Sequence, residues 1–574
     1  MYIFLSILKN FNSILAIAIV VYSLFLALTY SYFFKKNKKY IFRILCSIPF
    51  LSALVHFCIC GIRGYRGLYF TFMMFSYLYI ETVMPMIGVF FCKEGIVRKI
   101  TSAVLSFACF AAAVIFILNE TSFSPVHNYS RKDWSASFTS AVSAMRKEYA
   151  LSSWKEIDYD HLVDTYLPQI EEAQRNHDEV MYATIMTEFA YHFYDGHVYA
   201  VPNSPELIDG VRENLAGNDY GFSMIQLDSG EFIAIRVDKA SAAYSCGIHD
   251  GSQIVSWDGE DVSAAASEVE CIYPGFSFPA KENEDVFRPV FLAGKGGESV
   301  DVEYVNEEGY LNTVTLHSQG NYADRLMIVL RDLLDGDLPT RNNYTCMIDD
   351  NCGYLQLSAE SYNSIQDNIA VLRRGYYPSL TAYYNNLLTD LYEQGMKHLI
   401  IDLRNNGGGY DCVAGALVSL FTSDKMHSVS FGYEDEDGYH ITESEYIYPD
   451  GRWKDLPVYV LVNQKCMSAG DGAAKFLSEC ANVTLIGVTA SNGVNQNNGG
   501  YIFMSDNIVV FAYPHYMSLD ANAYPLIDTD ASRANRVPLD VKIPMTKELA
   551  LNIFSDSQID YELEYVMDYI SSSN

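Results

Sequence analysis

Positive charge is scarce in this chain. Its 574 residues hold 39 Lys and Arg against 70 Asp and Glu, so the formal net charge is −31. Residues 1–118 hold 11 of the basic residues and only Glu81 and Glu94 as acids, which gives this part +9 (11 minus 2). The remainder therefore carries −40 (−31 minus +9). A body this acidic argues against nucleic acid as a partner, because phosphate backbones require a basic surface.

The cysteines lack the spacing of a disulfide framework or a zinc site. Five of the 12 lie within apolar runs before residue 118, and the other seven are scattered over the rest of the chain. An odd and irregular set does not form a framework, although Cys346 and Cys352 could pair. No Cys/His spacing matches a zinc site. The sequence therefore implies no metal and no cofactor.

Four apolar runs fill the first 118 residues, at 13–34, 41–62, 69–92 and 100–118. Each approaches the roughly 20 residues that a helix needs to cross a bilayer, and a single signal peptide does not explain four of them. The loops after the first and third runs hold eight Lys or Arg, against two in the loop between the second and third runs. The positive-inside rule then predicts a multi-pass cell-membrane protein with four transmembrane helices. Everything after residue 118 is expected to be extracytoplasmic.

The rest of the chain is predicted to fold in three parts after a polar linker at residues 119–132. Residues 133–216 repeat aromatic and aliphatic side chains at helical spacing and predict a helical segment. Residues 217–316 combine short strands with turn glycines, which is typical of a small β-domain. Residues 317–574 alternate buried strands with helices and predict an α/β core with parallel strand pairing.

One stretch of that core, HLIIDLRNNGGG at residues 398–409, combines a buried strand with a glycine run. Glycines directly after a strand let the backbone turn sharply and present bare N–H groups. A second predicted strand, 458–463, leads into KCMSAGDGAA, which places Ser468 at a strand-to-helix junction before small residues. The two segments predict an exposed serine beside an oxyanion pocket built from glycine. The alternative is that Ser468 is an ordinary helix N-cap.

These motifs carry a family resemblance. DLRNNGGG, followed about sixty residues later by SAGD, resembles the carboxy-terminal processing (tail-specific) serine proteases, which share a catalytic core with the tricorn protease. The resemblance covers roughly residues 130–550. It implies a ClpP/crotonase-like sheet with helices in the protease core and a PDZ-like fold for residues 217–316. Asp471 stands where the family usually has Glu.

The resemblance implies that Ser468 is the nucleophile and that the N–H groups of Ala469 and Gly408 bind the oxyanion. A serine hydroxyl needs a base to take its proton. Family members with a Ser-Lys dyad carry a lysine where this chain has Asn492, and Asn cannot serve as a base. Either His197, which stands in an Asp-x-His element like that of the triad branches, is the general base, or the enzyme is inactive. Considered alone, His197 would be an ordinary turn histidine.

A triad also needs an acid to orient the imidazole. Asp528 and Asp530 lie 60 and 62 residues after Ser468, before an element similar to one in the family's triad branches. We favour Asp530, although both residues could instead cap a turn. Gln496 could also orient the base.

Other reactive side chains near these motifs have weaker claims. Cys466 belongs to the turn at the strand end, and Lys465 and Lys475 match no family position. We expect Lys475 to be a surface charge and His192 to be structural.

In the PDZ-like domain, Tyr220, Gly221 and Phe222 match the ligand-facing strand and loop. Such a domain takes up an extended peptide and its terminal carboxylate along an open strand edge. The alternative is that this domain only supports the protease core.

The sequence as a whole predicts a membrane-anchored, extracytoplasmic serine endopeptidase that cleaves peptides or protein tails through an acyl-enzyme. The alternative is an inactive peptide-binding or sensor protein on the same scaffold. A transporter or channel is disfavoured, because most of the mass is a soluble domain and the apolar runs lack paired charges.

Overall fold

A computed structural model describes most of the chain after residue 125. The described residues are 126–275, 277–278, 281–306, 308–334, 341–361, 378–435, 438–527, 537–555 and 559–573. Across these ranges we find no helix with the length and apolar character needed to span a bilayer. The four predicted transmembrane helices, within residues 1–118, lie outside the described residues.

The contacts divide the chain into two units, and the smaller one comprises Met1–Lys132 with Tyr501–Asn507. Its described part holds strand β1 (Val126–Asn128), which pairs in parallel with strand β16 (Asn497–Phe503), and a short 3-10 turn at Ser505–Asn507. Val126–Asn128 thus form a strand within the polar stretch 119–132, which was predicted to be a linker. The backbone groups of this polar stretch are satisfied by a neighbouring strand, which the side-chain pattern does not reveal.

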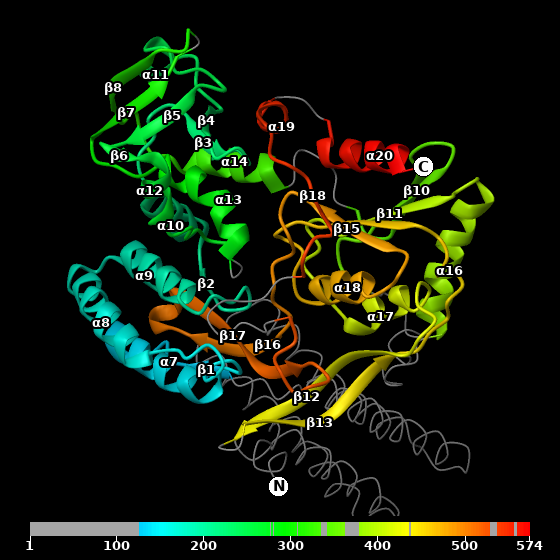
Figure 1. The fold of residues 1–574 in the computed structure, drawn as a ribbon. Coiled ribbons are helices and arrows are strands. Elements are labelled where there is room, and N and C mark those ends of the chain that lie inside the picture. Colours follow the sequence, from blue (N-terminus) through cyan, green and yellow to red (C-terminus); the bar gives the residue numbers. More distant parts are fainter. Residues whose placement is uncertain are drawn as a thin grey trace, which may run out of the picture. The chain divides into compact units, whose positions relative to one another are not determined.

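The larger unit, Asp133–Gly500 with Ile508–Asn574, begins with the predicted helical segment. Its helices are α7 (Trp134–Glu148), α8 (Tyr159–Asn176), α9 (Glu179–Tyr191) and α10 (Pro205–Ala216). Each is capped at its N-terminus by a side chain that accepts a backbone N–H, namely Asp133, Asp158, Asp178 and Ser204. Helices α7 to α9 lie side by side next to strand β17 (Figure 1), and Phe189 of α9 packs on Phe511 of that strand. The aromatic stripe is therefore core, as predicted.

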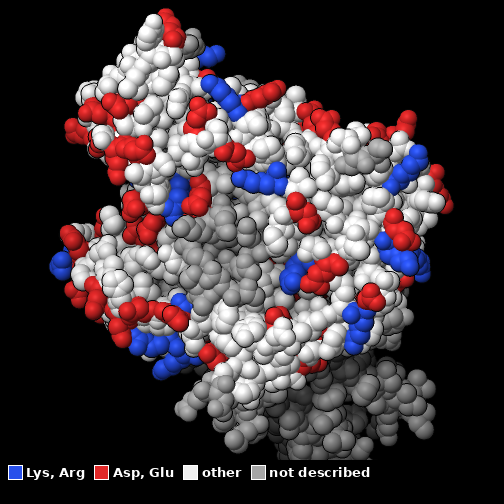
Figure 2. All heavy atoms as spheres, viewed as in Figure 1, with Lys and Arg blue, Asp and Glu red and all other residues white. Residues whose placement is uncertain are grey.

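The β-domain contains an antiparallel sheet with the strand order β3-β4-β5-β7-β8 and with β6 paired to β5. Its strands are β3 (Ser223–Gln226), β4 (Phe232–Ile235), β5 (Gln253–Trp257), β6 (Glu260–Asp261), β7 (Ser299–Val305) and β8 (Leu311–His317). Its helices are α11 (Ala242–Ser245), α12 (Val262–Ser267) and α13 (Lys281–Leu292), and α14 (Ala323–Leu334) follows. Acidic side chains are spread over this domain and the helical segment on the face shown in Figure 2.

A sheet with the order β18-β15-β14-β11-β10-β9 forms the α/β core. Its strands are β9 (Tyr344–Met347), β10 (Cys352–Gln356), β11 (His398–Asp402), β14 (Val458–Leu461), β15 (Val483–Gly487) and β18 (Val541–Lys542). All neighbours are parallel except β9 and β10. The predicted α/β core with parallel pairing is confirmed.

Helices cover this sheet on both faces, which explains the unbroken apolar run of β11. Leu399 and Ile401 pack in one hydrophobic cluster, and Ile400, which points to the other face, packs in a second one. On the first side lie α16 (Pro378–Glu393), α17 (Asp411–Val418) and α18 (Ala469–Ser478). On the second side lie α19 (Lys547–Ile553) and α20 (Tyr561–Ser573), and α18 and α20 flank the sheet in Figure 1.

Four further strands belong to the larger unit. Strands β12 (Met426–Asp435) and β13 (Gly438–Ile447) form a long hairpin, and the pairing of Asp435 with Gly438 puts the acidic run at 434–438 at the end of this hairpin. Strand β17 (Val509–Leu519) pairs antiparallel with β12 and with β2 (Tyr199–Pro202). This pairing brings the residues before β2 into the same region as the carboxyl ends of the core strands.

Candidate active site

Ser468 lies at a strained turn between β14 and α18. Its backbone angles are φ 59 and ψ −127, in a region that non-glycine residues rarely adopt. A sharp turn from strand to helix presents the side chain at its apex, as in the nucleophile elbow of other hydrolases. Ser468 is half-buried, and its side chain makes no capping hydrogen bond to α18. The N-cap alternative therefore has no support in the geometry.

Hydrogen bonds on both sides fix this turn. The N–H of Ser468 donates to the Val494 carbonyl at 2.8 Å, and the N–H of Met467 donates to the Asn406 carbonyl at 2.9 Å. Inside α18, Gly472 N–H donates to the Ser468 carbonyl at 3.0 Å. The strained conformation is thus held by residues that follow β11 and β15.

The Asn406 side chain joins the glycine run to the end of β10. It is fully buried, and its Nδ2 donates to the Leu357 carbonyl at 2.9 Å and to Glu360 Oε1 at 2.8 Å. Its Oδ1 accepts the Gly408 N–H at 2.9 Å. Asn406 therefore positions the loop that faces Ser468.

Gly408 lies directly against the nucleophile, as predicted. A Cβ on this residue would lie 2.5 Å from Ser468 Cβ, and φ is +91, so only glycine fits here. Its N–H donates to Asn406, however, and would have to leave that acceptor to bind an oxyanion. The sequence motif places the residue but does not reveal this competing acceptor.

Ala469, the other predicted oxyanion donor, is the first residue of α18. No carbonyl of the described residues accepts its N–H. A helix N-terminus favours negative charge, and an amide at this position is the kind of donor that stabilises a tetrahedral oxyanion. The structure therefore provides one open donor next to the Ser468 hydroxyl.

Asp471 holds the loop that carries Val494. It is fully buried, and its Oδ2 accepts the N–H groups of Gly493 at 2.9 Å and Val494 at 3.0 Å. Burial raises the pKa of Asp471 to about 7, against the opposing effect of the Ser491 hydroxyl and the two amides. Asp471, which replaces the family's usual Glu, thus positions Val494, whose carbonyl accepts the Ser468 N–H.

Replacing Asp471 by Asn is expected to stabilise the fold at pH 8 and to leave it unchanged near pH 4.5. The folded-state pKa of Asp471 is raised above the ordinary value of about 3.9, so the folded state binds the proton more tightly than the unfolded state. Stability therefore falls as the pH rises from about 4 to about 7, and an amide removes this loss while its oxygen still accepts both N–H groups. Urea denaturation of both proteins at the two pH values measures the effect. An equal difference at both pH values would contradict the assignment.

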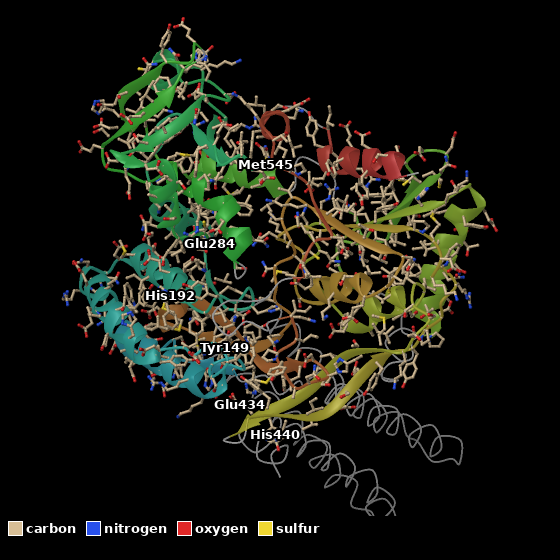
Figure 3. The ribbon with its side chains drawn as sticks, in the orientation of Figure 1. Tyr149, His192, Glu284, Glu434, His440 and Met545 are labelled. Carbon is tan, nitrogen blue, oxygen red and sulfur yellow. The ribbon has the colours of Figure 1, made fainter. Side chains whose placement is uncertain are left out.

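His197 lies in a tight turn before β2. Its backbone N–H donates to Asp195 Oδ1 at 2.8 Å, and its Nδ1 lies 3.9 Å from the same oxygen. Asp195 Oδ2 accepts the Tyr149 hydroxyl at 2.9 Å, and Figure 3 shows Tyr149 where the helical segment meets the strands. Burial lowers the pKa of His197, and the Asp195 carboxylate partly offsets this. A neutral imidazole at neutral pH is the form that a general base requires.

The His197 turn and the Ser468 turn share a neighbour. A Cβ on Gly196 would lie 3.0 Å from Val494 Cγ2, and the Val494 carbonyl holds the Ser468 amide. The same Cβ would lie 2.6 Å from Asn492 Oδ1. Asn492, predicted from the sequence to stand at the family's lysine position, donates its Nδ2 to the Gln464 carbonyl at 3.0 Å, and the histidine turn packs against it.

The predicted third member of the triad is not among the described residues, since Asp528 and Asp530 both lie outside them. Gln496 is described, and its amide is bonded to backbone groups of Ser518 and Leu526. It therefore anchors strand β17 rather than an imidazole. Asp195, which is 3% exposed, is the carboxylate that the structure pairs with His197. The Asp-x-His element of the sequence contains Asp195, but only its histidine was predicted to be catalytic.

The weaker candidates are accounted for by their surroundings. Cys466 is fully buried, and burial raises the pKa of its thiol well above the ordinary value. Lys475 pairs with Glu479 on the surface at 2.7 Å, as predicted. His192 Nε2 is bonded to the Tyr166 hydroxyl at 2.5 Å, which fits the structural role expected for it. Cys346 and Cys352 are unpaired thiols.

The predicted peptide-binding residues are turned into the β-domain. The Tyr220 ring is buried and its hydroxyl donates to the Gly297 carbonyl at 2.7 Å. Phe222 is fully buried against Trp257, and Gly221 N–H donates to Asp219 Oδ1 at 2.8 Å. Their side chains therefore contribute to the domain core, and any contact with a peptide would involve the backbone of β3.

A link between the β-domain and the site was not expected from the sequence. Asn283 of α13 donates to the carbonyls of Ala490 at 3.0 Å and Ser491 at 2.8 Å, and accepts the Ala490 N–H at 3.1 Å. Its neighbour Glu284, labelled in Figure 3, accepts the Tyr191 hydroxyl from α9. Helix α13 is thereby bonded to the loop that precedes Val494.

Comparison with known proteins agrees with the motifs. Residues 351–525 match peptidase family S41, a family of serine-type hydrolases, and this range contains both the glycine run and Ser468. The carboxy-terminal processing protease CtpA of Bacillus subtilis (strain 168) is 24% identical over 292 residues, which cover 51% of this chain and 51% of the relative. The chain thus matches about half the length of this curated relative.

Two solved structures are also similar. Mature CPAF complexed with lactacystin is 14% identical with a TM-score of 0.48, covering 77% of this chain and 98% of that one. The photosystem II D1 C-terminal processing protease is 19% identical with a TM-score of 0.31, covering 74% of this chain and 98% of that one.

Proposed function

From the peptidase family S41 segment at residues 351–525, we propose that the whole chain is a serine endopeptidase that cleaves peptides or protein tails. The observation that carries the proposal is the strained backbone of Ser468, held at the start of α18 beside Gly408. Strain of this kind persists only where the surroundings enforce it, and it is concentrated at reactive sites.

In the proposed reaction, the His197 imidazole takes the Ser468 proton as Oγ attacks the scissile carbonyl. The oxyanion then accepts the Ala469 N–H, in line with the N-terminus of α18. Gly408 N–H becomes a second donor if the glycine run turns away from Asn406 when substrate binds. His197 returns the proton to the leaving amine, and water releases the acyl group by the same steps in reverse.

We assign the orienting acid to Asp195 or, as predicted from the sequence, to Asp530 or Asp528. The 3.9 Å separation of Asp195 Oδ1 and His197 Nδ1 supports the first choice, since a small rotation of the ring would close a hydrogen bond. The Tyr149 hydroxyl keeps the Asp195 carboxylate in place during that rotation.

We further propose that the peptidase is anchored in the cell membrane by residues 1–118 and that its catalytic part is extracytoplasmic. The four apolar runs and the eight-to-two bias of basic residues between their loops support this placement. The β-domain is proposed to hold substrate as an added strand along the backbone of β3, which pairs with β4 and with no other strand of the described residues.

An inactive peptide-binding protein on the same scaffold is the second candidate. The observation that favours it is the Gly408 N–H, which is bonded to Asn406 and not open to an oxyanion. In that case the strained serine would be a remnant of an active ancestor.

Labelling with a fluorophosphonate separates the two candidates. An activated serine forms a covalent adduct, whereas an ordinary hydroxyl does not. We expect one adduct per chain, located on Ser468 by peptide mass mapping, and none in a Ser468→Ala variant. Ser478, which lies on the same helix, serves as the control, because Ser478→Ala should label like the wild type. Absence of labelling in a folded wild-type chain would contradict the peptidase proposal.

A further inference from the structure

A cavity of about 290 Å³ lies outside the catalytic residues, between helices α16 and α17 and the end of the β12–β13 hairpin. Its lining includes the carboxylates of Asp411, Glu445 and Asp450, and one basic residue, Arg452. Arg452 Nε pairs with Asp450 Oδ1 at 3.0 Å. The lining therefore carries a net negative charge even after that pair is discounted.

Asp411 is the member of this set whose charge is least compensated. Burial and, to a smaller extent, the neighbouring Glu445 carboxylate raise its pKa to about 6. No basic side chain of the described residues pairs with Asp411. A bound cation would offset both effects, because an opposite charge within a few ångströms favours the ionised carboxylate.

A hydroxyl in the cavity wall also lacks a partner. Ser428 is only 6% exposed and lines the cavity, and its hydroxyl forms no hydrogen bond with any described residue. The hydroxyl is therefore open to a hydrogen-bonding group that enters the cavity. A hydroxyl oxygen next to carboxylates can accept a hydrogen bond from an ammonium or guanidinium group.

The aromatic residues of the wall are suited to the same kind of ligand. Tyr446 and Tyr448 both line the cavity, and the Lys425 ammonium lies 3.6 Å from the centroid of the Tyr446 ring and 5.1 Å from that of Tyr448. These rings thus already accept a cation. The cavity size is at the lower end for small-molecule sites, which matches one extended side chain rather than a larger ligand.

The position of Asp411 connects the cavity to the nucleophile. Gly408 lies against Ser468, and Asp411 follows it by three residues, which span at most about 11 Å of chain. Asp411 therefore lies within a few residues' length of a peptide bound at Ser468.

We propose that this cavity is a specificity subsite that takes the side chain of a lysine or arginine of the peptide substrate. Asp411 pairs with its charge, the Ser428 hydroxyl accepts one of its N–H groups, and Tyr446 packs on its stem. This inference rests on the proposed peptidase function and adds the substrate class to it.

The test compares peptides that contain lysine with matched peptides that contain norleucine, which has a similar stem but no charge. The residue is moved through the positions on either side of the cleaved bond, and every peptide has an acetylated N-terminus, so that a free terminal amine cannot occupy the site. At one position we expect kcat/KM to be about tenfold higher for the lysine peptide than for the norleucine peptide, and Asp411→Asn to bring this ratio to about one. Asp390→Asn is the matched control, because this exposed acid of α16 is not part of the cavity lining.

The results separate this inference from the proposed function. If the wild type cleaves peptides but prefers lysine at no position, or if Asp390→Asn and Asp411→Asn reduce the preference equally, the subsite is wrong and the peptidase stands. Binding to the full chain carrying Ser468→Ala gives a readout that needs no hydrolysis. There the lysine peptide should bind about tenfold more tightly than the norleucine peptide, and equal affinities would overturn the subsite even if no peptide is cleaved.

Discussion

Replacing Ser468 by Ala is expected to lower kcat for peptide hydrolysis by a factor of about 10⁴ to 10⁶ while the chain stays folded. The hydroxyl is the attacking group, and no other described nucleophile can take its place, because the nearby Cys466 thiol is fully buried. The substitution replaces a hydroxymethyl group by a methyl group at a half-buried residue whose side chain forms no capping hydrogen bond. The free energy of unfolding should therefore be nearly unchanged. Peptide hydrolysis and thermal unfolding, measured on the same preparations, check both parts.

His197→Ala should produce a loss similar to that of Ser468→Ala, and the double variant should be no worse than either single one. Members of a catalytic unit act together, so their effects do not add. His192→Ala is the control, since this histidine is bonded to Tyr166 and has no place in the proposed reaction. Full activity of His197→Ala would remove the general base from the mechanism. Multiplying losses in the double variant would show that the two residues act independently.

Arg404→Ala is expected to have the largest effect on stability, a loss of about 3–5 kcal/mol in the free energy of unfolding. Arg404 is 8% exposed, and its guanidinium donates to Asp402 at 2.7 Å, to Asp560 at 2.6 Å and to Glu562 at 2.8 Å. Removing the cation leaves three largely buried carboxylates without a counter-charge. Because Asp560 and Glu562 stand at the start of α20, the variant should also release this helix from the sheet. Chemical denaturation of the full-length chain gives the change.

A second variant distinguishes loss of the charge from loss of the side chain. Arg404→Met combined with Asp560→Asn and Glu562→Gln removes most of the uncompensated charge, and it should regain part of the lost stability. Arg146→Ala, at an exposed pair with Asp160, should change nothing measurable. If the combined variant is as unstable as Arg404→Ala, buried charge is not the cause of the loss.

The parts of the fold that depend on local pattern could be predicted from the sequence. The apolar run before Asp402 gave the buried strand β11, the glycine run gave the turn against Ser468, and the helical spacing of aromatic residues gave α7 to α9. These features follow from residue type over a few positions. The parallel order of the core strands followed from their alternation with helices.

Features that depend on residues far apart in the chain could not be predicted. The partners of Arg404 at 560 and 562 lie 156 and 158 residues further on, and nothing near them indicates a buried cation. The bond from Gly408 to Asn406 is local, but its geometry depends on how Leu357 and Glu360 hold the amide. Tyr220 is buried in the β-domain core, although the family motif predicted that it faces a peptide. The motif identifies the segment but does not determine which of its side chains are exposed.

The three hydrogen bonds between Asn283 and residues 490–491 have a mechanical consequence. Any tilt of the β-domain that lifts α13 must either break these bonds or pull the 490–494 segment along with it. That segment ends at the Val494 carbonyl, which accepts the Ser468 N–H. Only residues 490–494 therefore connect the bonds of Asn283 to the backbone of Ser468. A movement of the β-domain would thus be transmitted to Ser468 through the backbone of residues 490–494.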